Sequence, residues 1–537
     1  MMFEKCLYNL NLGELSQLIG DEVVDALDAI GINANKSNLV DVILSSRGIG
    51  VLQTKKSRTI FFEKEANRTE LGLSILQVNR FKNTAWTACK HEIATCLGAD
   101  PIEVAEDIEI REESFDAAGS YSLMPYQNWM RKRVMEHFVT HNRKRALVHM
   151  PTGAGKTSTA MQIIFDHLRS KLPESTTIVW MAHSDELCEQ AIQSFAASWP
   201  SQSLGPARLW RAWGGQSDLG DYDGSGCNFV VTSFQTLYSW QRTSRNNVFE
   251  NVNRLKQHCD FLIVDEAHLS TAPTYASAIE YISGLNAKIL GLTATPGKHY
   301  IGGEESRTNE LVDFYEDTLI TMTNDIGEEI ESPISFLQSK RVLSQIETIP
   351  IPGSDVTLSD AEIRACADLF DLPESVLSEL GQDHIRTLNV SREVINIARE
   401  RQLQTIVFCP SKENAVVMAE YLKLNDCAAV AITGETDTFS RRTNLEKFKN
   451  GELRVITNYG VLTTGFDAPN IGAVVIARPT QSIVLYSQMI GRGIRGPLFG
   501  GTDNCLILNV EDNMTNLPDY QSASTYFNQY FSSGSGG

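Results

Sequence analysis

The residues most able to do chemistry form a glycine-containing segment, Met150-Pro151-Thr152-Gly153-Ala154-Gly155-Lys156-Thr157-Ser158, between an apolar run and a helical pattern. Two glycines would let backbone N–H groups converge on an anion, and the following helix would add its positive end. Lys156 would then reach the β- and γ-phosphates of ATP, and Thr157 would bind Mg²⁺. The segment from Thr152 to Ser158 therefore predicts a nucleotide cradle, with an ordinary strand-to-helix turn as the alternative. Met150 stands where the general pattern has glycine.

A pair of carboxylates follows a second apolar run. Asp265 and Glu266 come directly after residues 261–264, a run typical of a strand buried on both faces. Asp265 would hold Mg²⁺, and Glu266 would orient and deprotonate an attacking water molecule. With the cradle upstream, this pair predicts nucleotide hydrolysis.

Two arginines near the C-terminus could complete such a site. Arg492 and Arg495 stand three residues apart in a segment that the sequence predicts to be helical, so both side chains would project from one face. Arginines that reach across a cleft to a triphosphate raise the rate of phosphoryl transfer by about 10³ to 10⁵. The strand–helix region around them has no cradle of its own, so it is expected to complete a neighbour's site.

The elements that must position these residues form two regions of alternating strands and helices, predicted at 116–322 and 404–515. The predicted fold class is α/β: two tandem RecA-like domains of the P-loop NTPase type with parallel sheets, preceded by an N-terminal α+β domain at 1–115. A helical connecting segment is expected at 323–403 and a tail at 516–537.

The predicted N-terminal domain carries none of the nucleotide chemistry. Three helical patterns precede two strand-like runs, at 49–52 and 59–62, which are joined by the basic segment 55–58. This layout would suit a winged-helix-like module that touches the DNA backbone. A generic α+β partner-binding domain is slightly favoured, because the segment is acidic outside that basic tip.

Composition limits the partners and the compartment. The 537 residues carry a net charge of −19, so nucleic acid would have to bind in a locally basic groove. Ten cysteines without a CxxC pair indicate reduced thiols. Neither a signal-peptide layout nor a membrane-spanning apolar run is evident, so we expect a cytoplasmic protein that does not associate with membranes.

Taken together, the motifs resemble those of superfamily 2 helicases and translocases. The cradle, Asp265-Glu266-Ala267-His268 and Gly291-Leu292-Thr293-Ala294-Thr295-Pro296 look like the first motor domain of the type III restriction-subunit-like branch, in which Met150 is acceptable. Leu462–Pro469 and Gln488–Arg495 look like its second motor domain. The resemblance covers roughly residues 123 to 510.

The resemblance implies further roles. Gln127 would recognise adenine, Arg495 would be the better arginine-finger candidate, Arg492 would also contact phosphates, and Asp467 would order the nucleotide side of the cleft. Coupling of the phosphate site to movement is implied for His268, Thr293, Thr295 and Gln488. Nucleic-acid backbone contacts are implied for Ser184, Thr232, Ser411, Thr463 and Thr464.

These observations predict an ATP-dependent nucleic-acid translocase or helicase, most simply one that tracks duplex DNA, in a restriction or phage-defence system. The interval from Asn470 to Ser487 leaves no room for a strand-separating hairpin. Two alternatives remain open: an RNA-dependent ATPase or helicase, and an ATP-gated DNA-binding module that recruits a nuclease or another effector.

Overall fold

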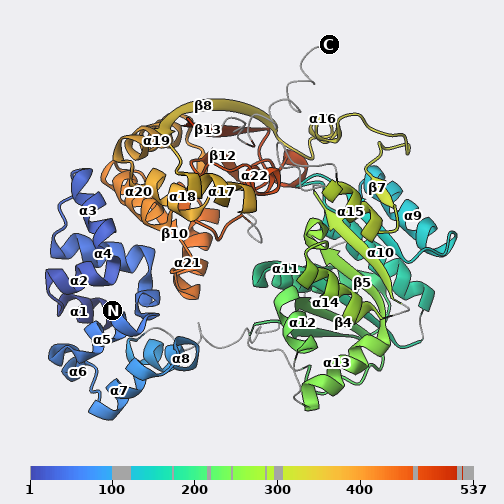
Figure 1. Ribbon diagram of the computed structural model, residues 1–537, viewed down its shortest axis with the longest axis horizontal. Helices are drawn as coiled ribbons and strands as arrows, with labels where there is room; N and C mark the ends of the chain where they lie inside the picture. Colours follow the sequence, from blue (N-terminus) through green and yellow to red (C-terminus); the bar gives the residue numbers. More distant parts are fainter. Residues whose placement is uncertain are drawn as a thin grey trace.

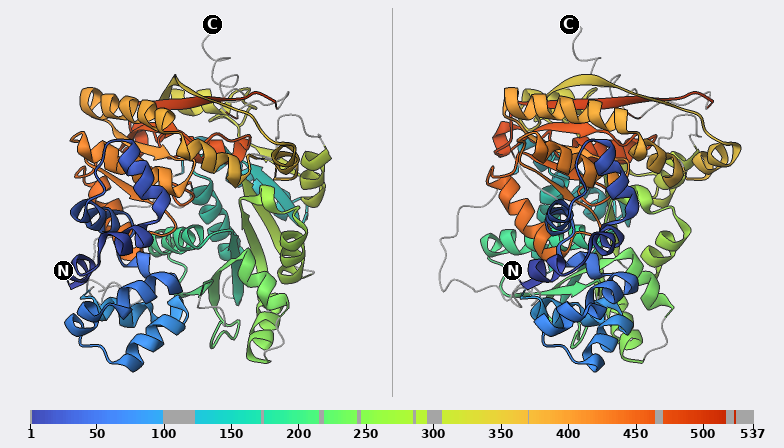
Figure 2. Two further views of the ribbon diagram at one scale, coloured as in Figure 1. Left: turned by 60° about the vertical axis from the view of Figure 1, so that its left-hand side comes forward. Right: turned by 90° about the vertical axis from the view of Figure 1, so that its left-hand side faces the viewer.

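A computed structural model describes most of the chain in three parts, a helical N-terminal unit and two α/β domains (Figure 1, Figure 2). The described residues are 2–98, 123–171, 174–214, 219–242, 246–284, 287–294, 306–369, 371–463, 470–516 and 523. In this part of the chain no helix combines the length and the apolar character needed to cross a bilayer.

All the helices and strands assigned in the described part of the N-terminal unit are helices, so the predicted α+β domain with a strand hairpin is wrong. Its elements are α1 (Met2–Tyr8), α2 (Leu12–Ile19), α3 (Asp21–Ala29), α4 (Lys36–Ser46), η1 (Gly48–Leu52), α5 (Lys55–Glu63), α6 (Glu65–Glu70), α7 (Ile75–Asn83) and α8 (Trp86–Cys96).

The periodicity of a helix explains why residues 55–62 form α5 and not part of a strand hairpin. Thr54 caps α5 by accepting a hydrogen bond from the Ser57 amide, and the buried side chains Ser57, Arg58, Phe61 and Phe62 follow at helical spacing. Arg58 donates hydrogen bonds to the carbonyls of Leu52, Gln53, Phe81 and Thr84. The residue therefore ties α5 to its neighbours from inside the unit and cannot contact DNA.

The first α/β domain is built on a seven-stranded parallel sheet of order β3-β4-β2-β5-β6-β1-β7. Its strands are β1 (Arg145–His149), β2 (Thr176–Ala182), β3 (Ala207–Ala212), β4 (Cys227–Ser233), β5 (Cys259–Asp265), β6 (Lys288–Thr293) and β7 (Leu319–Thr321). Its helices are α9 (Pro125–Val139), α10 (Lys156–Lys171), α11 (Asp185–Ser198), α12 (Phe234–Gln241), α13 (Asn246–His258), α14 (Pro273–Ser283) and α15 (Ser306–Phe314). Because β5, β6 and β1 are neighbours, their carboxyl ends meet at one edge.

The second α/β domain has a six-stranded parallel sheet of order β10-β11-β9-β12-β13-β8. Its strands are β8 (Gln345–Val356), β9 (Gln404–Phe408), β10 (Ala429–Ile432), β11 (Val455–Asn458), β12 (Ile471–Ile476) and β13 (Asn504–Met514). The helices of this part of the chain are α16 (Pro333–Ser339), α17 (Asp360–Leu369), α18 (Glu374–Gln382), α19 (His384–Asn396), α20 (Lys412–Leu424), α21 (Thr438–Lys449) and α22 (Ile483–Ile490).

The strand β8 lies in the segment that was predicted to be a helical connection. It contains Pro350 and Pro352. Proline lacks a backbone N–H but is tolerated on an edge strand, and β8 pairs only with β13 at the edge of the sheet. A purely helical connection at 323–403 is therefore wrong, although α16 to α19 do lie in that segment.

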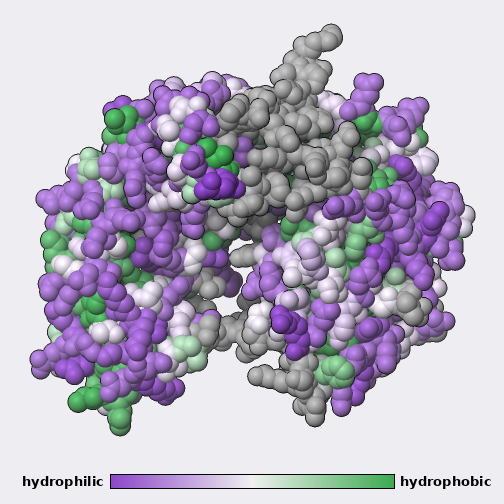
Figure 3. Space-filling view, in the orientation of Figure 1, coloured by the Kyte–Doolittle hydropathy of each residue, from purple (hydrophilic) through white to green (hydrophobic). Residues whose placement is uncertain are grey.

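The N-terminal unit packs on the second α/β domain, which is distant from it in sequence. Helix α3 contacts α20, and α4 contacts β10. Val416, Val417 and Ala431 of the second domain share one apolar cluster with the N-terminal helices. Figure 1 shows the unit beside α20 and β10, and Figure 3 shows a mainly hydrophilic surface that is hollowed between this side and the first domain.

Candidate nucleotide-binding site

The cradle lies between β1 and α10 and has the backbone that its glycines suggest. Gly153 and Gly155 both have φ of +81°, the left-handed region that glycine adopts without strain. Helix α9 braces the loop, because the Tyr126 hydroxyl and the Gln127 amide donate hydrogen bonds of 3.0 and 3.1 Å to the Ala154 carbonyl. A side chain on Gly155 would clash with Gln127. The loop is therefore held in shape before any nucleotide binds.

Gln127 does more in the protein than the predicted contact with adenine. Its amide oxygen accepts a 2.9 Å hydrogen bond from the Met124 N–H, and its amide nitrogen binds the cradle. The side chain is 4% exposed. Both polar groups are thus engaged within the chain, and adenine recognition by Gln127 stays a prediction.

Lys156 is the first residue of α10 and lies among charges from three elements. Its Nζ donates a 3.4 Å hydrogen bond to the Met150 carbonyl. Burial lowers the pKa of Lys156; Glu266 and Asp265 act in the opposite direction, and Arg492 lowers this pKa further. The lysine and the acidic pair of the first domain are therefore in one electrostatic environment with an arginine of the second domain.

Asp265 ends β5, Glu266 follows it, and the pKa values of the two carboxyl groups are shifted in opposite directions. Burial and the charge of Glu266 raise the pKa of Asp265. Burial would also raise the pKa of Glu266, but the contact with His268 and the charge of Lys156 outweigh it and lower that pKa. His268 Nδ1 lies 3.3 Å from Glu266 Oε2. Glu266 is thus kept ionised, as a group that accepts a proton from water must be.

The backbone of Glu266 is strained. Its φ of +50° places a residue with a side chain in the left-handed region. Such strain persists where the surrounding structure fixes it, and it is concentrated at functional sites. The Asp265 carboxylate accepts a 3.0 Å hydrogen bond from the Glu266 N–H, which stabilises this turn.

The residues at the site fit a Mg²⁺ ion that is shared with a nucleotide. The described residues contain no group of three or more His, Cys, Asp or Glu side chains able to hold a metal alone. Mg²⁺ commonly binds one or two protein oxygens together with substrate phosphates. Thr157, in the first turn of α10, and Asp265, at the end of β5, offer two such oxygens at the same sheet edge.

The second domain reaches the cradle through the residues that follow α22. Gly491 abuts Thr152 so closely that a side chain on Gly491 would clash with it. Leu343, which precedes β8, lies 2.7 Å from the position that a Cβ on Gly153 would take. Both domains therefore line the mouth of the cradle.

The two arginines do not sit on one helix, so the predicted geometry is wrong. Helix α22 ends at Ile490, and the backbone then forms a turn. In this turn Gly493 packs so closely on Val474 that a side chain on Gly493 would clash with it. Arg492 Nε donates a 3.3 Å hydrogen bond to the Gln488 carbonyl within this turn. Arg495 lies beyond it and pairs through its backbone with Leu343. The charge of Arg492 lowers the pKa of Lys156, so this arginine acts electrostatically on the cradle, and the finger role of Arg495 stays a prediction.

Other predicted site residues are distributed along the same sheet edges. Thr293 ends β6 and is buried, and Gln488 lies on α22. Ser158 follows Thr157 on α10. Thr295, Thr464 and Asp467 lie outside the described residues.

The hydroxyls predicted to contact nucleic acid mostly stabilise the protein itself. Ser184 and Ser411 cap α11 and α20 by accepting hydrogen bonds from the amides of Leu187 and Asn414. The Thr232 hydroxyl is buried and donates to the Ala212 carbonyl at 2.8 Å. Thr463 is partly exposed beyond β11. Their predicted contacts with a backbone stay predictions.

His149 lies beside the cradle and is not among the residues predicted from the sequence. Its Nε2 lies 3.1 Å from the Ala294 carbonyl and links the end of β1 to the residue after β6. Burial and the charge of Lys156 lower the pKa of His149 to about 4 even though the Ala294 contact raises it, so the ring is neutral at pH 7. The position of His149 directly before the cradle in the sequence could have indicated it as a site residue. No feature of the sequence indicates Leu343.

Two protein-family models match the chain on the two sides of this site. The model described as "Type III restriction enzyme, res subunit" matches residues 120–298, and the "Helicase conserved C-terminal domain" matches 387–496. These matches confirm the predicted resemblance to superfamily 2 helicases of the type III restriction-subunit-like branch. The expected pair of RecA-like domains with parallel sheets is confirmed.

Relatives of the chain include proteins named as helicases and as restriction enzyme subunits. The mitochondrial ATP-dependent helicase irc3 of Schizosaccharomyces pombe is 27% identical over 397 residues, which cover 73% of this chain and 58% of that protein. The type I restriction enzyme EcoAI endonuclease subunit of Escherichia coli is 24% identical, over 72% of this chain and 46% of that protein. The chain thus spans about half the length of these relatives.

A solved structure shares the fold. The ATP-dependent Type ISP restriction-modification enzyme LlaBIII bound to DNA superposes with a TM-score of 0.53 and 18% sequence identity. The match covers 80% of this chain and 30% of that one.

Proposed function

We propose that the chain is an ATP-dependent translocase that acts on duplex DNA. The observation that carries this proposal is the composite site, in which Gly491 of the second domain abuts Thr152 of the cradle and Arg492 acts on Lys156. A site divided between two domains changes when the nucleotide is hydrolysed, so hydrolysis can move one domain against the other.

Each residue has a proposed part in hydrolysis. Lys156 and the cradle N–H groups hold the β- and γ-phosphates. Glu266 takes a proton from the attacking water, and Arg492 stabilises the charge that develops on the transferred phosphoryl group. Thr157 and Asp265 would hold a Mg²⁺ ion, which when bound would supply positive charge at the phosphates. After phosphate release, the arginine loses its partner and the domains can separate.

Tracking without strand separation is favoured by the segment between the proposed motifs of the second domain. Residues 470–487 contain β12, a short connection and the first turns of α22. This leaves no inserted hairpin that could act as a wedge between strands. DNA as the substrate and a nuclease or other effector as a partner, in a restriction or defence system, are proposed from relatives named as restriction enzyme subunits.

The domain limits and the compartment are also proposed. We assign 116–322 to the first motor domain and extend the second from the predicted 404–515 to include β8, because β8 completes its sheet. A cytoplasmic location is inferred from the reduced cysteines; the structure contains ten free thiols.

The test compares ATP hydrolysis without a polymer and with RNA, single-stranded DNA or duplex DNA. We expect duplex DNA to stimulate hydrolysis while labelled strands stay annealed. Stimulation by RNA alone would favour the RNA-dependent alternative. Nucleotide-dependent binding of DNA without stimulated turnover would favour the ATP-gated binding module, and strong unwinding of a forked duplex would contradict tracking without separation.

A further inference from the structure

The N-terminal unit is joined to the second motor domain at the carboxyl end of β10. Thr436 Oγ1 donates a 2.7 Å hydrogen bond to the Ser46 carbonyl. Gly48 and Gly50 approach so closely that side chains there would clash with Asp437 and with the Glu435 carbonyl. The contact therefore fixes the loop that leaves β10.

An unbroken chain of ion pairs crosses this contact. Arg47 of the N-terminal unit lies 2.9 Å from one carboxylate oxygen of Glu435, and the other oxygen accepts a 2.6 Å hydrogen bond from Lys412 Nζ. Arg47 also donates to the Leu18 carbonyl, and its side chain is 13% exposed. Lys412 is 44% exposed, and the hydrogen bond with Glu435 raises its pKa. Arg47 is thus fixed in the protein, whereas Lys412 can exchange Glu435 for another partner.

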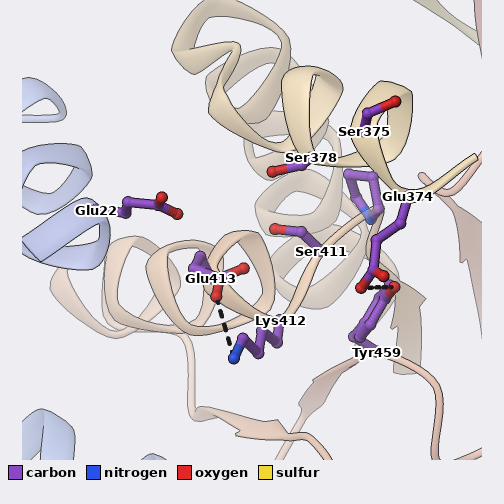
Figure 4. A pocket seen from close by; sticks show the side chains of 9 residues that line it. Glu22, Glu374, Ser375, Ser378, Ser411, Lys412, Glu413 and Tyr459 are labelled. Carbon is purple, nitrogen blue, oxygen red and sulfur yellow. Dashed lines mark hydrogen bonds and ion pairs between the residues drawn. The ribbon is translucent and has the colours of Figure 1, made fainter. Parts of the chain in front are cut away.

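Lys412 lies on the edge where the sequence predicts backbone contacts. It is the first residue of α20, next to Ser411, at the carboxyl end of β9. A cavity of about 410 Å³ opens there, beside the neighbouring end of β11 (Figure 4). Among the described residues, Lys412 is the one basic side chain that lines it, together with the carboxylates of Glu22, Glu374 and Glu413. Glu22 belongs to α3 of the N-terminal unit and points toward this cavity (Figure 4).

We propose that the N-terminal unit sets the strength of the second motor domain's grip on a phosphodiester backbone, through the chain Arg47–Glu435–Lys412. This inference rests on the proposed function. Lys412 is the backbone contact, and it must leave Glu435 to reach a phosphate. Arg47 makes that exchange easier, because it binds the second oxygen of Glu435 and stabilises the carboxylate once Lys412 has gone.

The surrounding carboxylates keep the contact between Lys412 and a phosphate weak enough for a motor. Glu22, Glu374 and Glu413 repel a polyanion at short range, so they limit how tightly the single ammonium group can hold a phosphate. A motor has to release its track in every cycle. A weak contact whose strength is set by Arg47 satisfies that requirement, and it explains why an ion-paired residue of an accessory unit reaches this edge.

The test measures duplex DNA binding by the full chain across a series of salt concentrations. Glu435→Gln, which keeps its size and leaves Lys412 with only its longer ion pair to Glu413 at 3.6 Å, should tighten binding about two- to fivefold, the range of one exposed ion pair. Arg47→Met should weaken it by a similar factor. Lys412→Ala should weaken binding and reduce the slope of log Kd against log salt by about one. In the Lys412→Ala background, neither of the other substitutions should change Kd further.

Arg80→Met is the matched control, because Arg80 and Glu92 form a similar pair on the surface of the same unit, 2.9 Å apart. It should leave Kd unchanged. The inference is overturned if Glu435→Gln fails to tighten binding. It is also overturned if Arg47→Met weakens binding as much in the Lys412→Ala background as in the wild type, since Arg47 would then act only by docking the N-terminal unit. A wild-type chain that binds none of the polymers would instead contradict the proposed function.

Discussion

Glu266 shows how the site prepares a single residue for its proposed role. Its backbone has a positive φ, its pKa is lowered by His268 and Lys156 against the effect of burial, and it follows the carboxylate proposed to bind Mg²⁺. Its neighbour Asp265 has a raised pKa at the same strand end. Two adjacent carboxylates thus have different protonation equilibria, which allows them different roles.

Replacing Glu266 by glutamine removes the proton acceptor and keeps the shape of the side chain. We expect Glu266→Gln to retain ATP affinity and to lower kcat by about 10² to 10⁴. Steady-state hydrolysis and equilibrium nucleotide binding measure the two effects separately. Glu280→Gln, on the surface of the same domain, is the control; turnover of Glu266→Gln near that of wild type would remove Glu266 from this role.

Arg492 is expected to act only in turnover, because it comes from the domain that does not hold the nucleotide. Arg492→Ala should reduce kcat by about 10³ or more while changing ATP affinity far less. Arg242→Ala, an arginine stacked on Tyr238 in the first domain, should change neither quantity. Equal losses in affinity and turnover would show that Arg492 only helps to bind ATP.

At the level of elements, the sequence predicted the strands that carry the site more successfully than the connections between them. The runs before the cradle and before Asp265 became β1 and β5, because continuous apolar segments suit strands buried on both faces. The run at 59–62 became part of α5 because residues three and four apart also form an apolar helical face. A short apolar run fits both the strand period and the helix period, and only tertiary packing decides which of the two structures forms.

The turn after α22 shows why the site itself was only partly predictable. The spacing of Arg492 and Arg495 suggested a shared helical face, but Gly491 and Gly493 pack against Thr152 and Val474 and end the helix earlier. These contacts join residues far apart in sequence, so no local pattern reveals them. For the same reason, β8 and the Arg47–Glu435 pair could not be predicted.

The second domain depends on one buried ion pair between elements. Arg386 of α19 binds both carboxylate oxygens of Asp512 on β13 at 2.7 Å, and both side chains are almost fully buried. Asp512→Ala would leave a buried guanidinium without its partner and should lower stability by about 3–5 kcal/mol. Glu446→Ala, which removes the exposed partner of Arg442, should cost well below 1 kcal/mol.

Chemical denaturation monitored by circular dichroism measures both changes. A similar small loss in the two variants would show that the buried pair does not stabilise the domain.

Across the whole molecule, the proposed mechanism requires the two motor domains to meet at the cradle. Gly491 has φ of −56°, so this backbone angle does not disfavour valine, whose Cβ would clash with Thr152 and would also approach the Ser487 carbonyl oxygen closely. Gly491→Val should hold the domains apart: ATP still binds, while stimulation of hydrolysis by duplex DNA is lost. Gly13→Ala, where the added group would have ordinary contacts, is the control. Normal stimulation in Gly491→Val would contradict closure at this contact.

Movement along duplex DNA is tested most directly by displacement of a third strand from a triplex. The wild-type chain should release the triplex-forming strand in the presence of ATP and Mg²⁺, at a rate that falls as the length of duplex leading to the triplex increases, while the duplex stays annealed. Glu266→Gln should release none. Release that is independent of ATP, or the absence of release despite hydrolysis stimulated by duplex DNA, would contradict the account of this chain as a translocase.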